Sequence, residues 1–327
     1  MIYNIKPWVL DNKIIFYDII INNNFIYLIS PNHSDSKEQF IHVSIENINI
    51  PLFNKIVQSG YTNILILVYE INVKLTNNIN VLITYKEVSK MFLIDSRASS
   101  HKCKNEMSIT TLFKGDYKLI PLFYNYYKTL GFKHFFLYYN DILTSEIIDI
   151  CNKPDITLIE WNFPYMRISD CPELYKGNIH NAQLGQMHHA LYHFGKNVYK
   201  YMAFLDLDEY IEINNIKLHS YLETNNINCL GFTCKWAKTS DDNIPLKFPK
   251  AFLVEQTIRT PYYKSKFIYN THYISCIDVH YPKLVRLDQF TPNMFFYHFY
   301  NWTKKRQTTN SDITSWEYIT FDKTLNN

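Results

Sequence analysis

The stretch YMAFLDLDEYI, residues 201–211, sets three carboxylates directly after a run of mostly apolar residues. They belong to Asp206, Asp208 and Glu209. Burying acids at the end of an apolar strand is costly unless a cation balances their charge. Because side chains alternate along a strand, we expect Asp206 and Asp208 to face one side and Leu207 the other. Two carboxylates on one side can share Mg²⁺ or Mn²⁺, with phosphate oxygens completing the ligands.

Other interpretations of these acids remain beside the metal site. The plainest is that they mark a strand end that meets solvent. A Walker B strand also ends in acids, but none of the seven glycines has the spacing of a P-loop or of a dinucleotide-binding loop. A metal-dependent phosphodiesterase usually gathers more acids and histidines, and it is the less favoured alternative. Glu209 falls on the opposite side of the strand, so we expect it to anchor local structure.

Expected strands and helices alternate in the sequence before this stretch. Apolar periodicity predicts strands at 107–113, 133–140 and 156–161, and helices at about 119–130, 144–153 and 184–195. This alternation predicts an α/β fold with a largely parallel sheet that is covered on both faces. Ligands of such sheets bind beyond the carboxyl ends of the strands, where Asp206 and Asp208 fall.

The first hundred residues have a different pattern. Short β-rich runs alternate with turns rich in Asn and Ser, without a helical period. We predict a small antiparallel β domain over residues 1–100 and the α/β domain over 101–327. The polar stretch 95–106 is the expected linker.

The composition is that of a globular protein with a near-even charge balance. The chain has 327 residues, 47% of them hydrophobic, with 33 Lys and Arg against 30 Asp and Glu. We therefore expect no nucleic-acid partner. No stretch approaches the ~20 apolar residues of a membrane span, and neither a signal peptide nor a C-x-x-C pair is found. We predict a cytoplasmic protein. The many Asn, Ile, Lys and Tyr residues are typical of an AT-rich genome, such as that of a large DNA virus, a parasite or a low-GC bacterium. If the source is a virus, we expect the protein in the host cytoplasm.

Several segments together resemble a known family. LIPLFYNYYKTLGFKHFFLYYND (119–141) is followed by QLGQMHHAL (183–191), by DLDEY (206–210) and by a late YHFYN that contains His298. In this order they resemble GT-A glycosyltransferases, most closely glycosyltransferase family 92 and its family 2-like relatives. The resemblance covers about residues 105–305, and DLDEY is its strongest match.

The resemblance implies a GT-A fold and a function. A UDP-sugar donor would pass its sugar to a glycan hydroxyl, with inversion and with a carboxylate as general base. Asp206 would contact the ribose and the metal, and Asp208 and His298 would ligate Mn²⁺ or Mg²⁺. Lys264 or Lys266 would neutralise the diphosphate. The other implied donor-binding residues are Lys114, Asn140, Asp141 and Gln183, and the candidate bases are Asp241, Asp242 and Glu255.

A glycan-binding or scaffold protein on a degenerate transferase fold is the alternative from another class. Tyr139 favours it, because the family tends to have Asp at this position, although Asp141 can take over the carboxylate. The intact Asp206, Asp208 and His298 speak against it. The role of the N-terminal β domain is open between acceptor binding and homodimerisation.

Overall fold

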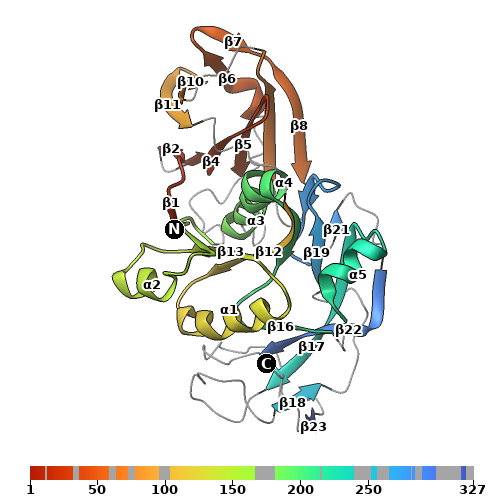
Figure 1. Cartoon of the computed structure of the whole chain (residues 1–327). Coiled ribbons are helices and arrows are strands. Elements are labelled where there is room, and N and C mark those ends of the chain that lie inside the picture. Colours follow the sequence, from red (N-terminus) through yellow and green to blue (C-terminus); the bar gives the residue numbers. More distant parts are fainter. Residues whose placement is uncertain are drawn as a thin grey trace.

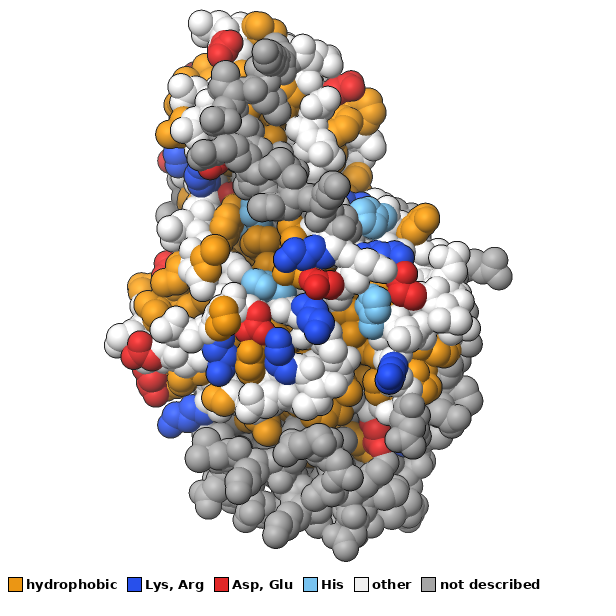
Figure 2. Space-filling view, in the orientation of Figure 1, with side chains coloured by type: hydrophobic (Ala, Val, Ile, Leu, Met, Phe, Trp, Pro, Cys, Tyr) orange, Lys and Arg blue, Asp and Glu red, His pale blue; other side chains and the backbone are white. Residues whose placement is uncertain are grey.

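The chain forms a small β region above a larger sheet with helices, as Figure 1 shows. The computed structural model describes residues 1–11, 13–31, 37–58, 64–72, 78–95, 104–165, 181–213, 216–238, 252–255, 265–280, 282–283, 289–299 and 318–321. On the face seen in Figure 2, Lys and Arg side chains lie among Asp and Glu side chains, so the even charge balance of the chain also holds locally there.

Two four-stranded antiparallel sheets make up most of the N-terminal β region. Their strand orders are β4-β5-β9-β8 and β11-β10-β6-β7, and β2 and β3 form a separate hairpin. Buried side chains of both sheets meet in one apolar cluster, which confirms the antiparallel β-structure expected here. The strands are β2 Trp8–Leu10, β3 Lys13–Phe16, β4 Asp18–Asn22, β5 Phe25–Pro31, β6 Ile41–Ile45, β7 Ile48–Ile50, β8 Leu52–Gln58, β9 Ile64–Glu70, β10 Asn78–Tyr85 and β11 Val88–Asp95.

The large sheet is mixed rather than largely parallel. Its order is β1-β14-β13-β12-β15-β19-β17-β18-β23, with β22 pairing both β16 and β17. Five neighbouring strands of this sheet run parallel, in the order β1, β14, β13, β12 and β15. The next neighbour, β19, pairs with β15 in the antiparallel direction. The strands are β1 Ile2–Tyr3, β12 Lys104–Phe113, β13 His134–Tyr139, β14 Ile156–Glu160, β15 Tyr199–Phe204, β16 Glu209–Ile213, β17 Cys229–Lys238, β18 Phe252–Glu255, β19 Lys266–Asn270, β22 Gln289–Phe299 and β23 Tyr318–Phe321.

Two of the expected helices, α1 and α2, lie within a few residues of their expected bounds. Gly131 follows α1 with a φ of +94°, a conformation that glycine adopts without a steric penalty. Thr144 caps α2, because its side chain accepts a hydrogen bond from the backbone N–H of Ile147. The helices are α1 Ile120–Thr129, α2 Ser145–Ile150, α3 Asn181–His189, which continues as a π-helical turn over Ala190–Gly195, α4 Lys196–Val198 and α5 Leu218–Thr224.

Both faces of the parallel strands are covered, as expected. Phe135 and Leu137 of β13 belong to the apolar cluster that contains α1 and α2. The alternate residues Phe136 and Tyr138 belong to a second cluster, which contains α3. Period-two alternation along β13 therefore supplies both layers of the core.

The N-terminal β region packs directly on the large sheet. β1 pairs with β14 of that sheet, and Tyr17 is buried in the same cluster as Trp161 and α3. Gly185 of α3 lies so close to Tyr17 that an added Cβ would be 2.6 Å from its ring. The domain boundary near residue 100 stays a prediction. Among the described residues, no helix is long and apolar enough to cross a membrane.

Candidate functional site

Asp206 and Asp208 lie in a turn that follows β15, not in the strand itself. β15 ends at Phe204, and the backbone N–H of Glu209 donates to the carbonyl of Asp206 at 3.1 Å to close the turn. Leu207 is buried, while both aspartates are partly exposed. The prediction that the strand itself continues through the acids is wrong, because this turn interrupts the extended chain before β16.

The turn stands at the carboxyl edge of the parallel strands. Leu205 donates its backbone N–H to the carbonyl of Thr110 in β12, so the chain leaves β15 beside its parallel neighbour. Lys114 and Asp141 follow β12 and β13 at this same edge. This is the edge at which ligands of α/β sheets bind.

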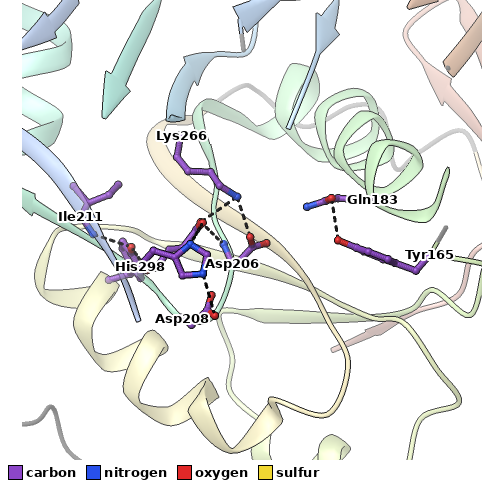
Figure 3. Close-up of polar contacts among 9 residues, drawn as sticks. Tyr165, Gln183, Asp206, Asp208, Ile211, Lys266 and His298 are labelled. Atoms are coloured by element: carbon purple, nitrogen blue, oxygen red, sulfur yellow. Dashed lines mark hydrogen bonds and ion pairs between the residues drawn. The ribbon is translucent and has the colours of Figure 1, made fainter. Parts of the chain in front are cut away.

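Lys266 holds two of the acids together. It is the first residue of β19, and its side chain is only 4% exposed. Its ammonium nitrogen lies 3.0 Å from an oxygen of Asp206 and 3.0 Å from an oxygen of Glu209 (Figure 3). Burial alone would lower the pKa of Lys266, but the charges of Asp206 and Glu209 raise it above its ordinary value, so the ammonium stays charged.

Glu209 is the most buried acid of the turn. It is 1% exposed, and its Oε2 accepts a hydrogen bond from the backbone N–H of Asp206 at 2.9 Å. Burial raises the pKa of Glu209 to about 7, with Lys266 lowering it and Asp206 raising it. The expectation that Glu209 anchors local structure agrees with these contacts, although its link to Lys266 was not foreseen.

His298 reaches the turn through strand pairing. β22 pairs antiparallel with β16, and His298 is the partner of Glu209 in that register. Its Nε2 lies 3.4 Å from an oxygen of Asp208, and its Nδ1 lies 3.6 Å from an oxygen of Glu209 (Figure 3). The ring stacks on Trp236 of β17 with centroids 4.5 Å apart. The expected meeting of His298 with Asp208 is therefore present in the fold.

The other candidate residues have varied surroundings. Lys114 forms an exposed ion pair with Asp141 at 2.8 Å, and this hydrogen bond lowers the pKa of Asp141. Asn140 donates from its amide to the carbonyls of Trp161 and Phe163, so its donors already support the chain. Their roles in donor binding stay predictions.

Gln183 lies on α3, and its side-chain oxygen accepts a hydrogen bond from the hydroxyl of Tyr165 at 3.2 Å (Figure 3). The remaining candidates have side chains outside the described part of the structure. Glu255 ends β18, but its side chain is outside the described part of the structure. The candidates that lie outside the described residues altogether are Asp241, Asp242 and Lys264.

A divalent cation fits the donor atoms at the turn. In the described part of the chain, no three His, Cys, Asp or Glu side chains form a ready metal-binding cluster. However, Asp208 and His298 present an oxygen and a nitrogen 3.4 Å apart, which suits two ligands of one ion at about 2.1 Å each. The turn carries three carboxylates, so a cation would also balance negative charge here.

Comparison with known proteins identifies the family. The model of glycosyltransferase family 92 matches residues 105–326, more than half of the chain. No curated protein matches. A solved structure of a putative glucose-1-phosphate thymidylyltransferase from Bacillus anthracis in complex with a sucrose is 10% identical, with a TM-score of 0.27, over 50% of this chain and 72% of that one; a likeness this low carries no argument. The family match includes the turn, Lys266 and His298, and the chain belongs to glycosyltransferase family 92.

Proposed function

We propose that the protein is a metal-dependent transferase that moves a sugar from a UDP-sugar donor to a glycan hydroxyl, with inversion. The observation that carries the proposal is the cluster of carboxylates at the turn, where Asp206 and Glu209 pair with Lys266 and Asp208 lies 3.4 Å from an imidazole nitrogen of His298. An anionic diphosphate would be repelled by such a turn unless a divalent cation lay between them. Membership of a glycosyltransferase family supports the same reaction class.

Asp208 and His298 would hold Mn²⁺ or Mg²⁺, and Asp206 would divide its carboxylate between the cation and the donor ribose. The cation, when bound, would stabilise negative charge on the departing diphosphate. Lys266 balances Asp206 and keeps a positive charge beside the donor site. Because the ammonium of Lys266 already has two carboxylate partners, we propose that it acts on the diphosphate through its charge and not through a direct contact.

The general base for inversion is proposed among Asp241, Asp242 and Glu255. Trp236 stacks on His298, so β17 brings the chain close to the turn shortly before the two aspartates in sequence. A carboxylate near the acceptor hydroxyl can take its proton as the new glycosidic bond forms.

The test is transfer and hydrolysis across a panel of UDP-sugars, with and without Mn²⁺. We expect turnover with at least one donor only when the metal is present, and we expect Asp208→Ala to lower it by roughly 100-fold or more. Asp149→Ala, on the exposed surface of α2, is the matched control and should retain activity. Absence of metal-dependent turnover with every donor would contradict the proposal.

Glycan binding without turnover is the second candidate. Tyr139 favours it, since this ring packs on Phe113 with centroids 5.2 Å apart where the family tends to have a carboxylate. The two candidates differ in the same assay, because a binding protein would bind glycans but leave every donor intact.

A further inference from the structure

Glu209 contacts the backbone of Asp206 and the side chains of Lys266 and His298. One carboxylate oxygen accepts from the backbone N–H of Asp206 at 2.9 Å and lies 3.0 Å from the ammonium of Lys266. The other lies 3.6 Å from Nδ1 of His298. The side chain of Glu209 is 2% exposed, so we expect it to contact neither donor nor acceptor.

We propose that Glu209 is the positioning residue of the cation site, which sets Asp206, Asp208 and His298 in place without touching substrate. This inference rests on the proposed function. It assigns Glu209 a defined role in the reaction, beyond that of one more acid in the turn.

Glu209 fixes the shape of the turn from both sides. Its backbone N–H donates to the carbonyl of Asp206, while its carboxylate accepts from the N–H of the same residue. This reciprocal pair closes a ring around Leu207 and Asp208. The hydroxyl of Tyr127 donates to the Glu209 carbonyl at 2.7 Å, which ties the ring to α1. The direction in which Asp208 points is therefore set by Glu209.

Glu209 also sets the charges beside the turn. Lys266 is shared between Glu209 and Asp206, so the ammonium does not bind Asp206 alone. A neutral residue at position 209 would leave Asp206 as the one carboxylate on Lys266, and Asp206 would then be less able to bind a cation.

The position of Glu209 beside Nδ1 leaves Nε2 of His298 directed at Asp208. A carboxylate beside the second ring nitrogen is the arrangement that orients histidine ligands in metal sites. At 3.6 Å this approach is longer than a hydrogen bond, so it acts here through charge and packing.

The test compares Glu209→Gln with Glu212→Gln. Glu212 is a buried acid of the same strand, but it accepts a hydrogen bond from Tyr297 instead of facing the turn. Mn²⁺ affinity is measured by electron paramagnetic resonance on donor-free protein. We expect Glu209→Gln to weaken Mn²⁺ binding by about 10-fold to 100-fold, and Glu212→Gln to leave it unchanged. Folding of each variant is checked by thermal unfolding.

A second variant and a metal-free measurement keep the outcome decisive. Glu209→Asp retains the charge that balances Lys266 but is too short to reach the N–H of Asp206, so we expect an intermediate loss of affinity. In metal-free protein, ¹⁵N NMR of the His298 ring should change in Glu209→Gln and not in Glu212→Gln.

Each result points to one conclusion. Unchanged Mn²⁺ affinity and unchanged His298 signals in Glu209→Gln overturn the positioning role and leave the transferase proposal standing. If the wild-type protein binds no Mn²⁺ but the His298 signals still change, the metal part of the proposed function is wrong while Glu209 does set the turn.

Discussion

Two acid–base clusters in this protein, one buried and one partly exposed, use similar residues in different ways. The turn cluster consists of Asp206, Asp208, Glu209, Lys266 and His298. The interface cluster consists of Asp18, Tyr3, Tyr138 and His189, between the N-terminal β region and the large sheet. In the interface cluster, Asp18 and His189 have fully buried side chains, whereas Asp206 is 36% exposed.

The interface cluster is closed because every contact of its acid is made inside the protein. Asp18 accepts from the hydroxyl of Tyr3, from the N–H groups of Lys6 and Ile19, and from His189 at 2.8 Å. Burial alone would raise the pKa of Asp18, but the hydrogen bond and charge of His189 lower it below its ordinary value. A buried acid whose hydrogen bonds are all made inside the protein supports the fold, whereas partly exposed acids at the edge of a sheet are suited to bind a ligand.

The largest expected effect is on stability, in the interface cluster. Asp18→Ala leaves four donors without their acceptor, so we expect a loss of about 3–5 kcal/mol in the free energy of unfolding. Urea unfolding measures this loss, with Asp149→Ala on the exposed surface of α2 as the control. A loss below about 1 kcal/mol would mean that the cluster does not hold the two regions together.

Lys266→Met should have a somewhat smaller effect that a cation can reverse. Removing the ammonium leaves Asp206 and Glu209 as buried or half-buried carboxylates without their partner, and we expect a loss of about 3 kcal/mol. Mn²⁺ should raise the melting temperature of this variant more than that of Asp18→Ala. Equal responses of the two variants to Mn²⁺ would remove the distinction between the clusters.

Acid should destabilise the protein through the histidines of α3 and the π-helical turn. Burial lowers the pKa of His188 to about 4, and burial with the charge of His189 lowers that of His193 to about 3. Below the ordinary histidine pKa of about 6.5, the unfolded chain therefore binds more protons than the folded protein does. The free energy of unfolding is highest above this pH and decreases as the pH falls toward 4.

For His188 alone we expect a loss of about 2–3 kcal/mol between pH 7 and pH 4.5. Urea unfolding at the two pH values measures it, and His188→Gln should reduce the difference. Loss of the carboxylate contribution of Asp18 follows only at lower pH, as the pH falls from the ordinary aspartate pKa through the lowered one. A pH-independent stability over this range would show that His188 titrates normally in the folded protein.

Local signals predicted the elements that position the site. Apolar periodicity predicted α1 and α2 to within a few residues of their bounds, and the apolar run before Asp206 predicted β15. The alternation of strands and helices predicted that the acids lie at the carboxyl edge of the sheet. These features depend on neighbours in the chain, so they can be read without the fold.

Contacts between distant segments escaped prediction. The sequence offered Lys264 and Lys266 equally, and only the pairing of β19 with β15 brings Lys266 to Asp206. Asp18 begins β4 among apolar residues, but its partner His189 is 171 positions away, so local pattern does not show the interface cluster. The sequence predicted a largely parallel sheet, but the strands after β15 include antiparallel ones. Local periodicity shows where a strand lies and not the strand with which it pairs.

The acidic residues after the apolar run, the α/β alternation before them and the resemblance to glycosyltransferase family 92 can all be read from the sequence. The turn that holds these acids and the partners that balance their charge come from the folded structure. Burial and strand pairing place Lys266 between Asp206 and Glu209 and bring His298 against Asp208, and these are charge interactions that act through space. Spacing along the chain shows which residue types are present, but the charge balance of a site depends on distances that the folded chain alone sets.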